Sequence, residues 1–151
     1  MRRVVVLPNR SGWPTPKRLS QIKADPLDTR LRIEAGQNLA AMNRFAEAMA
    51  QFAETVRIQP GLAEAHVLYG AALGQQGRTS DAVAQFREAL RLNPSLQEAR
   101  LNLGIALLNQ GLPSDALAEL EQISAVNPNH AQATQMANAI RARLAPPVMF
   151  R

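Results

Sequence analysis

The sequence has 151 residues, of which 46% are hydrophobic and only 4% aromatic. This length suits one domain with its own core, and the composition favours packed helices over a sheet. Because the sequence contains no cysteine, it excludes disulfides, thiolate metal sites and a cysteine nucleophile. The net charge of +5 lies in residues 1–30, whereas residues 31–151 carry ten arginines and ten acidic residues. The neutral body argues against a nucleic-acid-binding fold.

Residues 1–25 are predicted to form an irregular tail, because several prolines and a glycine interrupt any regular element. The apolar run Val4–Leu7 is too short for a signal peptide or a membrane span. We therefore expect a cytoplasmic protein, or a periplasmic or organellar one if the N-terminus is a processed signal. The tail is either a solvated leader or an anchor to an anionic partner, which would use Arg2, Arg3, Arg10, Trp13, Lys17 and Arg18.

After the tail, the sequence predicts helices at residues 26–41, 44–58, 62–75, 78–91, 96–109, 113–125 and 130–144. For the first helix, Asp25 is the expected N-cap and Pro26 the first-turn proline. Two later helices are expected to begin with capping boxes. These are Ser95 with Glu98, and Asn129 with Gln132.

Three prolines divide the helical region into repeats, because Pro60, Pro94 and Pro128 are each 34 residues apart. Aligned on these prolines, the sequence forms repeats at residues 29–62, 63–96 and 97–130. Equivalent positions carry similar side chains in all three repeats. At positions 8, 11, 15, 20 and 24 respectively they are Gly36, Gly70 and Gly104; Leu39, Leu73 and Leu107; Asn43, Gly77 and Gly111; Ala48, Ala82 and Ala116; Phe52, Phe86 and Leu120.

Each of these positions has a physical reason. Small residues at positions 8 and 20 let two antiparallel helices approach closely, and the large residues at positions 11 and 24 fill the remaining space. Glycine or asparagine at position 15 suits the left-handed conformation that ends a helix. Each repeat is therefore expected to be a helical hairpin.

The repeated pattern resembles the tetratricopeptide repeat family over residues 29–130, and residues 131–145 resemble the capping helix of such arrays. The resemblance implies an all-α, right-handed superhelical solenoid of antiparallel helix pairs over residues 26–145, followed by a C-terminal tail at 146–151. One departure from the family pattern is the polar residue at position 4, where a bulky one is usual. These residues are Arg32, His66 and Arg100, and they predict a thinner core at one edge of each hairpin.

The resemblance also implies a concave groove lined by the first helix of each hairpin. Its expected residues are Ile33, Gln37, Val67, Leu68, Ala71, Leu101, Asn102, Ile105, Leu108 and Met136. This largely apolar strip would suit an amphipathic helix or an extended peptide, unless it packs against neighbouring helices or is covered by the protein's own tail. The basic residues with which chaperone adaptors of the family grip a terminal carboxylate are missing here.

No catalytic, cofactor or metal site is predicted. The only imidazoles, His66 and His130, lie in different parts of the array, and the sequence contains no phosphate-binding glycine loop. The leading hypothesis is a scaffold or adaptor, not an enzyme, that binds a partner protein, alone or in a larger complex. The alternatives are a tether to nucleic acid or an anionic surface through the tail, and a non-catalytic recruiting subunit of an enzyme complex. The 15 arginines against two lysines favour a GC-rich bacterial source.

Overall fold

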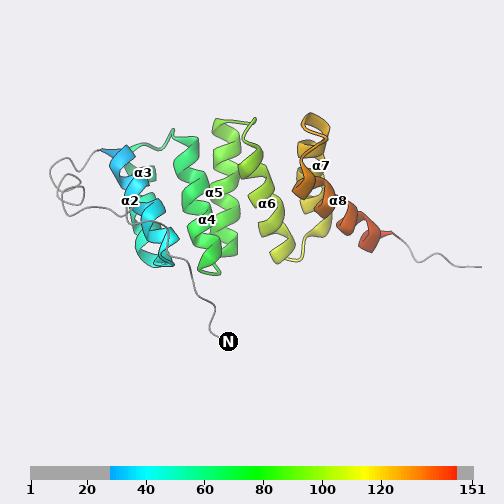
Figure 1. The fold of residues 1–151 in the computed structure, drawn as a ribbon, viewed down its shortest axis with the longest axis horizontal. Coiled ribbons are helices and arrows are strands. Elements are labelled where there is room, and N and C mark those ends of the chain that lie inside the picture. The colour runs from blue at the N-terminus through cyan, green and yellow to red at the C-terminus, as the bar shows by residue number, and fades with distance from the viewer. Residues whose placement is uncertain (1–27, 146–151) are drawn as a thin grey trace, which may run out of the picture. The chain divides into compact units, whose positions relative to one another are not determined.

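The computed structural model describes residues 28–145, which contain seven α-helices and no strand (Figure 1). Contacts divide the chain into two units, Met1–Pro60 and Gly61–Arg151. The helices of the first unit are α2 (Thr29–Ala41) and α3 (Phe45–Ile58). Those of the second are α4 (Ala63–Gln75), α5 (Thr79–Leu92), α6 (Gln97–Asn109), α7 (Pro113–Val126) and α8 (Ala131–Leu144). The predicted all-α fold of helical hairpins is confirmed, and within residues 28–145 no helix is long and apolar enough to cross a membrane.

The start of the first helix differs from the prediction. Helix α2 begins at Thr29, and its N-cap is Asp28, whose carboxylate accepts a hydrogen bond of 3.1 Å from the backbone N–H of Leu31. Asp25 is therefore not the cap of this helix, because a cap must lie within reach of the first free N–H groups. Asp25 and Pro26 themselves lie outside the described residues.

The predicted capping boxes are also wrong. At α6 the N-cap is Leu96, and Ser95 instead donates from its N–H (3.1 Å) and its hydroxyl (2.7 Å) to the side-chain oxygen of Asn93. At α8 the cap is His130, whose Nδ1 accepts from the N–H of Ala133 at 3.2 Å. Each helix begins one residue later than expected, so the polar side chain after the proline belongs to the preceding turn.

The turns inside the hairpins follow the prediction for position 15. Asn43, Gly77 and Gly111 have positive φ angles of 59°, 74° and 74°. In each hairpin the next N–H donates back to a carbonyl five residues earlier, as from Arg78 to Leu73 at 2.9 Å. These bonds satisfy carbonyls at the helix end and reverse the chain.

A substitution at Gly77 tests the importance of this left-handed turn. We expect Gly77→Ala to lower the free energy of unfolding by about 1–2 kcal/mol, because a Cβ disfavours positive φ. Gly61→Ala is the matched control, since Gly61 is also exposed, has open space where a Cβ would be added and has no positive φ. Urea denaturation followed by circular dichroism measures both, and an equal loss in the two variants would contradict the proposed role of the turn.

The two helices of each hairpin pack through the residues at positions 8 and 24. A Cβ at Gly70 would lie 2.7 Å from Cε1 of Phe86, and one at Gly104 would lie 3.1 Å from Cγ of Leu120. In the first unit, Phe52 covers Gly36 in the same way. Glycine therefore lets the large side chain of the second helix lie directly on the backbone of the first, and a Cβ at Gly104 would require Leu120 to shift by a few tenths of an ångström.

A polar link joins the two helices of each hairpin at position 4, where the sequence predicted a thinner core. Nδ1 of His66, a residue only 5% exposed, lies 2.8 Å from the side-chain oxygen of Gln85. The guanidinium of Arg100 donates to Glu119 at 2.8 Å, and Arg32 donates to Gln51 at 3.4 Å. Each pair joins positions 4 and 23 of one repeat, so it holds the two helices of one hairpin together.

Candidate functional site

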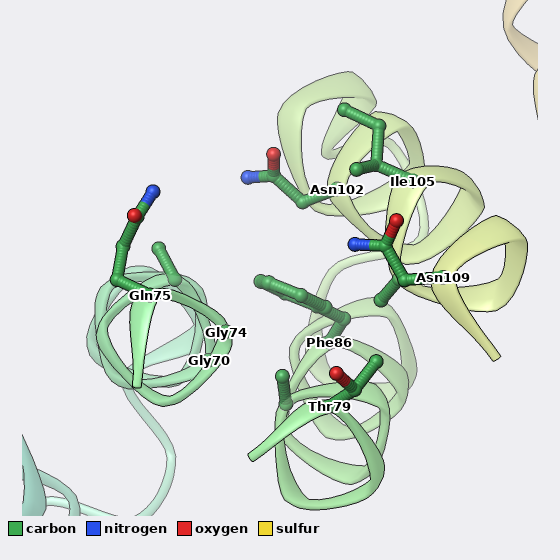
Figure 2. A pocket seen from close by; sticks show the side chains of 11 residues that line it. Gly70, Gly74, Gln75, Thr79, Phe86, Asn102, Ile105 and Asn109 are labelled. Carbon is green, nitrogen blue, oxygen red and sulfur yellow. The ribbon is translucent and has the colours of Figure 1, made fainter. Parts of the chain in front are cut away.

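A hollow of about 270 Å³ opens in the second unit between α4, α5 and α6 (Figure 2). We call it the amide hollow. It is lined by Gly70, Ala71, Gly74, Gln75, Thr79, Ala82, Phe86, Asn102, Ile105, Ala106 and Asn109. None of these lining residues is charged, and most are small or apolar. The hollow therefore suits an uncharged group that presents both apolar surface and hydrogen-bonding atoms.

The hollow exists because α4 presents glycine and alanine on this side. Gly74 has no side chain, and a Cβ placed there would have only Ala82, at 3.9 Å, as its nearest neighbour. Gly70 is covered by the ring of Phe86, which comes from α5 and lines the hollow between α4 and α6 (Figure 2). The small residues thus leave space that a larger side chain on α4 would fill.

Three side-chain amides surround this space. Gln75 lies at the end of α4, and Asn102 and Asn109 lie seven residues apart on α6, hence on one face of that helix. Figure 2 shows the amides of Asn102 and Asn109 directed from α6 toward the α4 side of the hollow. Within residues 28–145, none of the three amides hydrogen-bonds to another protein group. An amide both donates and accepts, so these groups can pair with the N–H and C=O of a peptide backbone.

The structure brings together part of the groove predicted from the sequence. Ala71, Asn102 and Ile105 line the amide hollow. Four other predicted groove residues lie on α4, α6 or α8 and are half-buried: Leu68, Leu101, Leu108 and Met136. Ile33, half-buried, and Gln37, exposed, belong to α2 in the first unit.

One predicted groove residue requires correction. Val67 is only 5% exposed, belongs to the core and is not among the residues that line the amide hollow. The lining residues that are absent from the predicted groove include Gln75 and Asn109. Both occupy position 13 of their repeats, so an uncharged amide in the last turn of two equivalent helices was the available signal.

A second hollow, of about 360 Å³, lies between α7 and α8. Its polar side chains already bind one another. Arg141 donates to Glu121 at 2.6 Å and to Asn138 at 2.9 Å, and the hydroxyls of Ser124 and Thr134 lie 3.3 Å apart. Because these groups hydrogen-bond to each other, this hollow offers a ligand fewer available donors and acceptors than the amide hollow does.

The two histidines have structural partners. His66 contacts Gln85, and His130 caps α8. In the described part of the chain, no three residues among His, Cys, Asp and Glu gather in a way that could hold a metal ion. The predicted tail residues Arg2, Arg3, Arg10, Trp13, Lys17 and Arg18 lie outside the described residues.

Comparison with known families identifies the repeat. Two tetratricopeptide repeat models match the sequence, at residues 33–97 and 73–140, and together they extend without a gap over most of the helical region. The chain belongs to the tetratricopeptide repeat (TPR) family. A search of curated proteins found no match to this TPR sequence.

Solved structures share the fold of this TPR chain at low sequence identity. The crystal structure of MamA is 20% identical, with a TM-score of 0.80 over 83% of this chain and 74% of its own. YrrB, described as a TPR protein with an unusual peptide-binding site, is 21% identical, with a TM-score of 0.74 over 83% of this chain and 65% of its own. The first TPR of Spaghetti, bound to an HSP90 peptide, is 20% identical, with a TM-score of 0.76 over 81% of this chain and 97% of its own.

Proposed function

We propose that this TPR chain is a non-catalytic scaffold or adaptor that binds a segment of a partner protein at the amide hollow of α4 and α6. The observation that carries the proposal is the set of three amides around an uncharged hollow, none of which hydrogen-bonds to another group of residues 28–145. Such a surface can bind a peptide backbone through the amides while one apolar side chain of the peptide enters the hollow. At about 270 Å³ the hollow is smaller than most pockets that enclose a whole small molecule.

The fold relatives support binding of a peptide in general. YrrB has a peptide-binding site, and the first TPR of Spaghetti was solved with a peptide bound. The hollow of the present chain, however, contains no lysine or arginine. A terminal carboxylate or an acidic peptide would find no cation there, so we do not propose an acidic chaperone tail as the partner.

A contact test locates the binding face. Because the chain has no cysteine, Ala71→Cys gives a single thiol that can carry a photoreactive crosslinker at the rim of the hollow. We expect this position to crosslink a partner protein in cell lysate, whereas Ala84→Cys, exposed on α5 outside the hollow, does not. Mass spectrometry of the crosslinked species identifies the partner.

A charge substitution then tests whether the hollow binds that partner. We expect Ile105→Glu to weaken binding at least tenfold, because a carboxylate would be placed against the apolar side chain of the ligand without a counter-charge. Ala84→Glu is the matched control, and circular dichroism checks that both variants stay helical. Unchanged affinity of the Ile105→Glu variant would show that the partner binds elsewhere.

Two alternatives from the sequence remain predictions. One is a tether through the basic tail, whose residues lie outside the described part of the chain. The other is a recruiting subunit of an enzyme complex, which would use the same face to bind a protein segment. The charge substitution separates the first from the hollow, since binding of a tail-bound partner would not depend on Ile105.

A further inference from the structure

The face that carries the amide hollow also carries two carboxylates. Glu64 on α4 precedes Ala71 by seven residues, and Glu98 on α6 precedes Ile105 by seven. Residues seven apart share one face of a helix and are separated along it by about 10 Å. Both carboxylates therefore lie on the same face of their helices as Ala71 and Ile105, which we call the open face, about two helical turns from these two lining residues.

The two carboxylates lie at the same end of this face. Helix α4 precedes α5 and α6 follows it, each through a short turn, and α4 and α6 contact each other directly (Figure 1). The side chain of Gln110, just after α6, donates to the hydroxyl of Ser80 at the start of α5 at 3.0 Å, so α5 and α6 are antiparallel. Since α4 and α5 form a hairpin, α4 and α6 run in the same direction. Their first turns, which contain Glu64 and Glu98, are thus neighbours.

No cation neutralises these two carboxylates within residues 28–145. Neither Glu64 nor Glu98 forms an ion pair there. By contrast, acidic residues near the end of the second helix of a hairpin do form ion pairs. In α5, for example, Glu88 is paired with Arg91, whose hydrogen bond lowers the pKa of the glutamate. The one basic side chain in α6, that of Arg100, is bound to Glu119 of α7. The open face of α4 and α6 is therefore negative at one end and uncharged at the other.

We propose that the partner segment carries a lysine or arginine close to the apolar residue that enters the amide hollow. This inference rests on the proposed function and specifies its ligand. An extended chain advances about 3.3 Å per residue, so a separation of about 10 Å corresponds to roughly three residues. The basic residue thus lies about three positions from the apolar anchor, where it meets Glu64 and Glu98. Anionic ligands such as nucleic acid are repelled from this face.

Selection from a library of random 12-residue peptides displayed on phage, with the full chain as bait, tests the inference. We expect selected peptides to combine an aliphatic residue with lysine or arginine about three positions away. Selection on Glu64→Gln/Glu98→Gln keeps the aliphatic residue and loses the basic one. For a selected peptide, the double variant raises the dissociation constant about three- to tenfold at low salt, as expected for two exposed ion pairs.

The matched control removes two acidic residues of the same kind elsewhere. Asp81 and Asp115 occupy the first turns of α5 and α7, as Glu64 and Glu98 do in α4 and α6. Asp81→Asn/Asp115→Asn makes the same change in net charge and in the helix N-termini, and it also breaks the exposed ion pair between Asp81 and Arg78. We expect the selection and the affinity to stay unchanged.

Three results would overturn the inference. The first is a set of peptides that depend on Ile105 but lack the basic residue, in which case the proposed function stands and only its ligand is wrong. The second is an equal loss of basic residues with the control variant, which would reflect net charge and not this face. The third is a failure to select any peptide that depends on Ile105, and the crosslinking from Ala71→Cys then decides separately whether the proposed function survives.

Discussion

Phe86→Ala is expected to lower the free energy of unfolding by about 3–5 kcal/mol, the usual cost of removing a buried phenylalanine. Phe86 is 3% exposed and lies on the backbone of Gly70, so its loss leaves a cavity between α4 and α5 that neither helix can close without moving. Urea denaturation of the full chain, followed by circular dichroism, measures the loss. A cost below about 1 kcal/mol would show that the contact between positions 8 and 24 is not a main source of stability.

A double-mutant cycle tests whether the glycine and the phenylalanine act as a pair. Gly70→Ala places a Cβ 2.7 Å from the ring of Phe86 and should be destabilising. Phe86→Leu reproduces the side chain that the third hairpin uses in Leu120, and we expect Gly70→Ala to cost less in that background. Equal costs in both backgrounds would mean that the helix separation, and not this contact, sets the need for glycine.

Arg100→Ala is expected to cost about 1.5–3 kcal/mol, the range for hydrogen bonds to charged groups. The side chains of Arg100 and Glu119 are only 17% and 24% exposed, and Arg100 also donates to Gln122 and to the carbonyl of Pro94. Removing the guanidinium leaves Glu119 partly buried without a counter-charge, which is the main reason for the loss.

Two controls distinguish burial from charge. Arg78→Ala breaks an ion pair whose two side chains are each 52% exposed, and we expect a change of less than about 1 kcal/mol. Arg100→Met/Glu119→Leu replaces the partly buried pair by apolar side chains and should recover most of the stability lost in Arg100→Ala. If Arg100→Met/Glu119→Leu were less stable than Arg100→Ala, the ion pair would stabilise the fold by more than apolar side chains at the same two positions do.

The helices and hairpin turns were predictable because their determinants are local and repeat. A 34-residue period places the prolines, and glycine or asparagine at position 15 marks each turn. The N-caps were not predictable from residue type alone. Ser95 has the right side chain, but Asn93 binds it in the preceding turn, and His130 caps α8 although histidine is not a usual cap.

The candidate site was predicted only in part, because exposure depends on the neighbouring helix. Ile33, Val67 and Leu101 occupy the same position of their repeats, yet only Val67 is buried. Periodicity places all three on one face, but the side chains that cover a given residue come from elsewhere in the fold. The polar links show the same limit. A repeated spacing of 19 residues joins position 4 to position 23, but only the structure shows that these side chains meet.

The order of the helices in the second unit determines where this unit loosens first. Its main contacts join helices that are neighbours in sequence, and α8 packs chiefly against α7. In an array of this kind, local opening starts at the helix with the fewest packing partners and costs less free energy than global unfolding. Fraying of α8 therefore exposes α7 but leaves α4, α5 and α6 in place. The amide hollow, lined by residues of these three helices, therefore remains intact through the fluctuations that open that end of the unit most often.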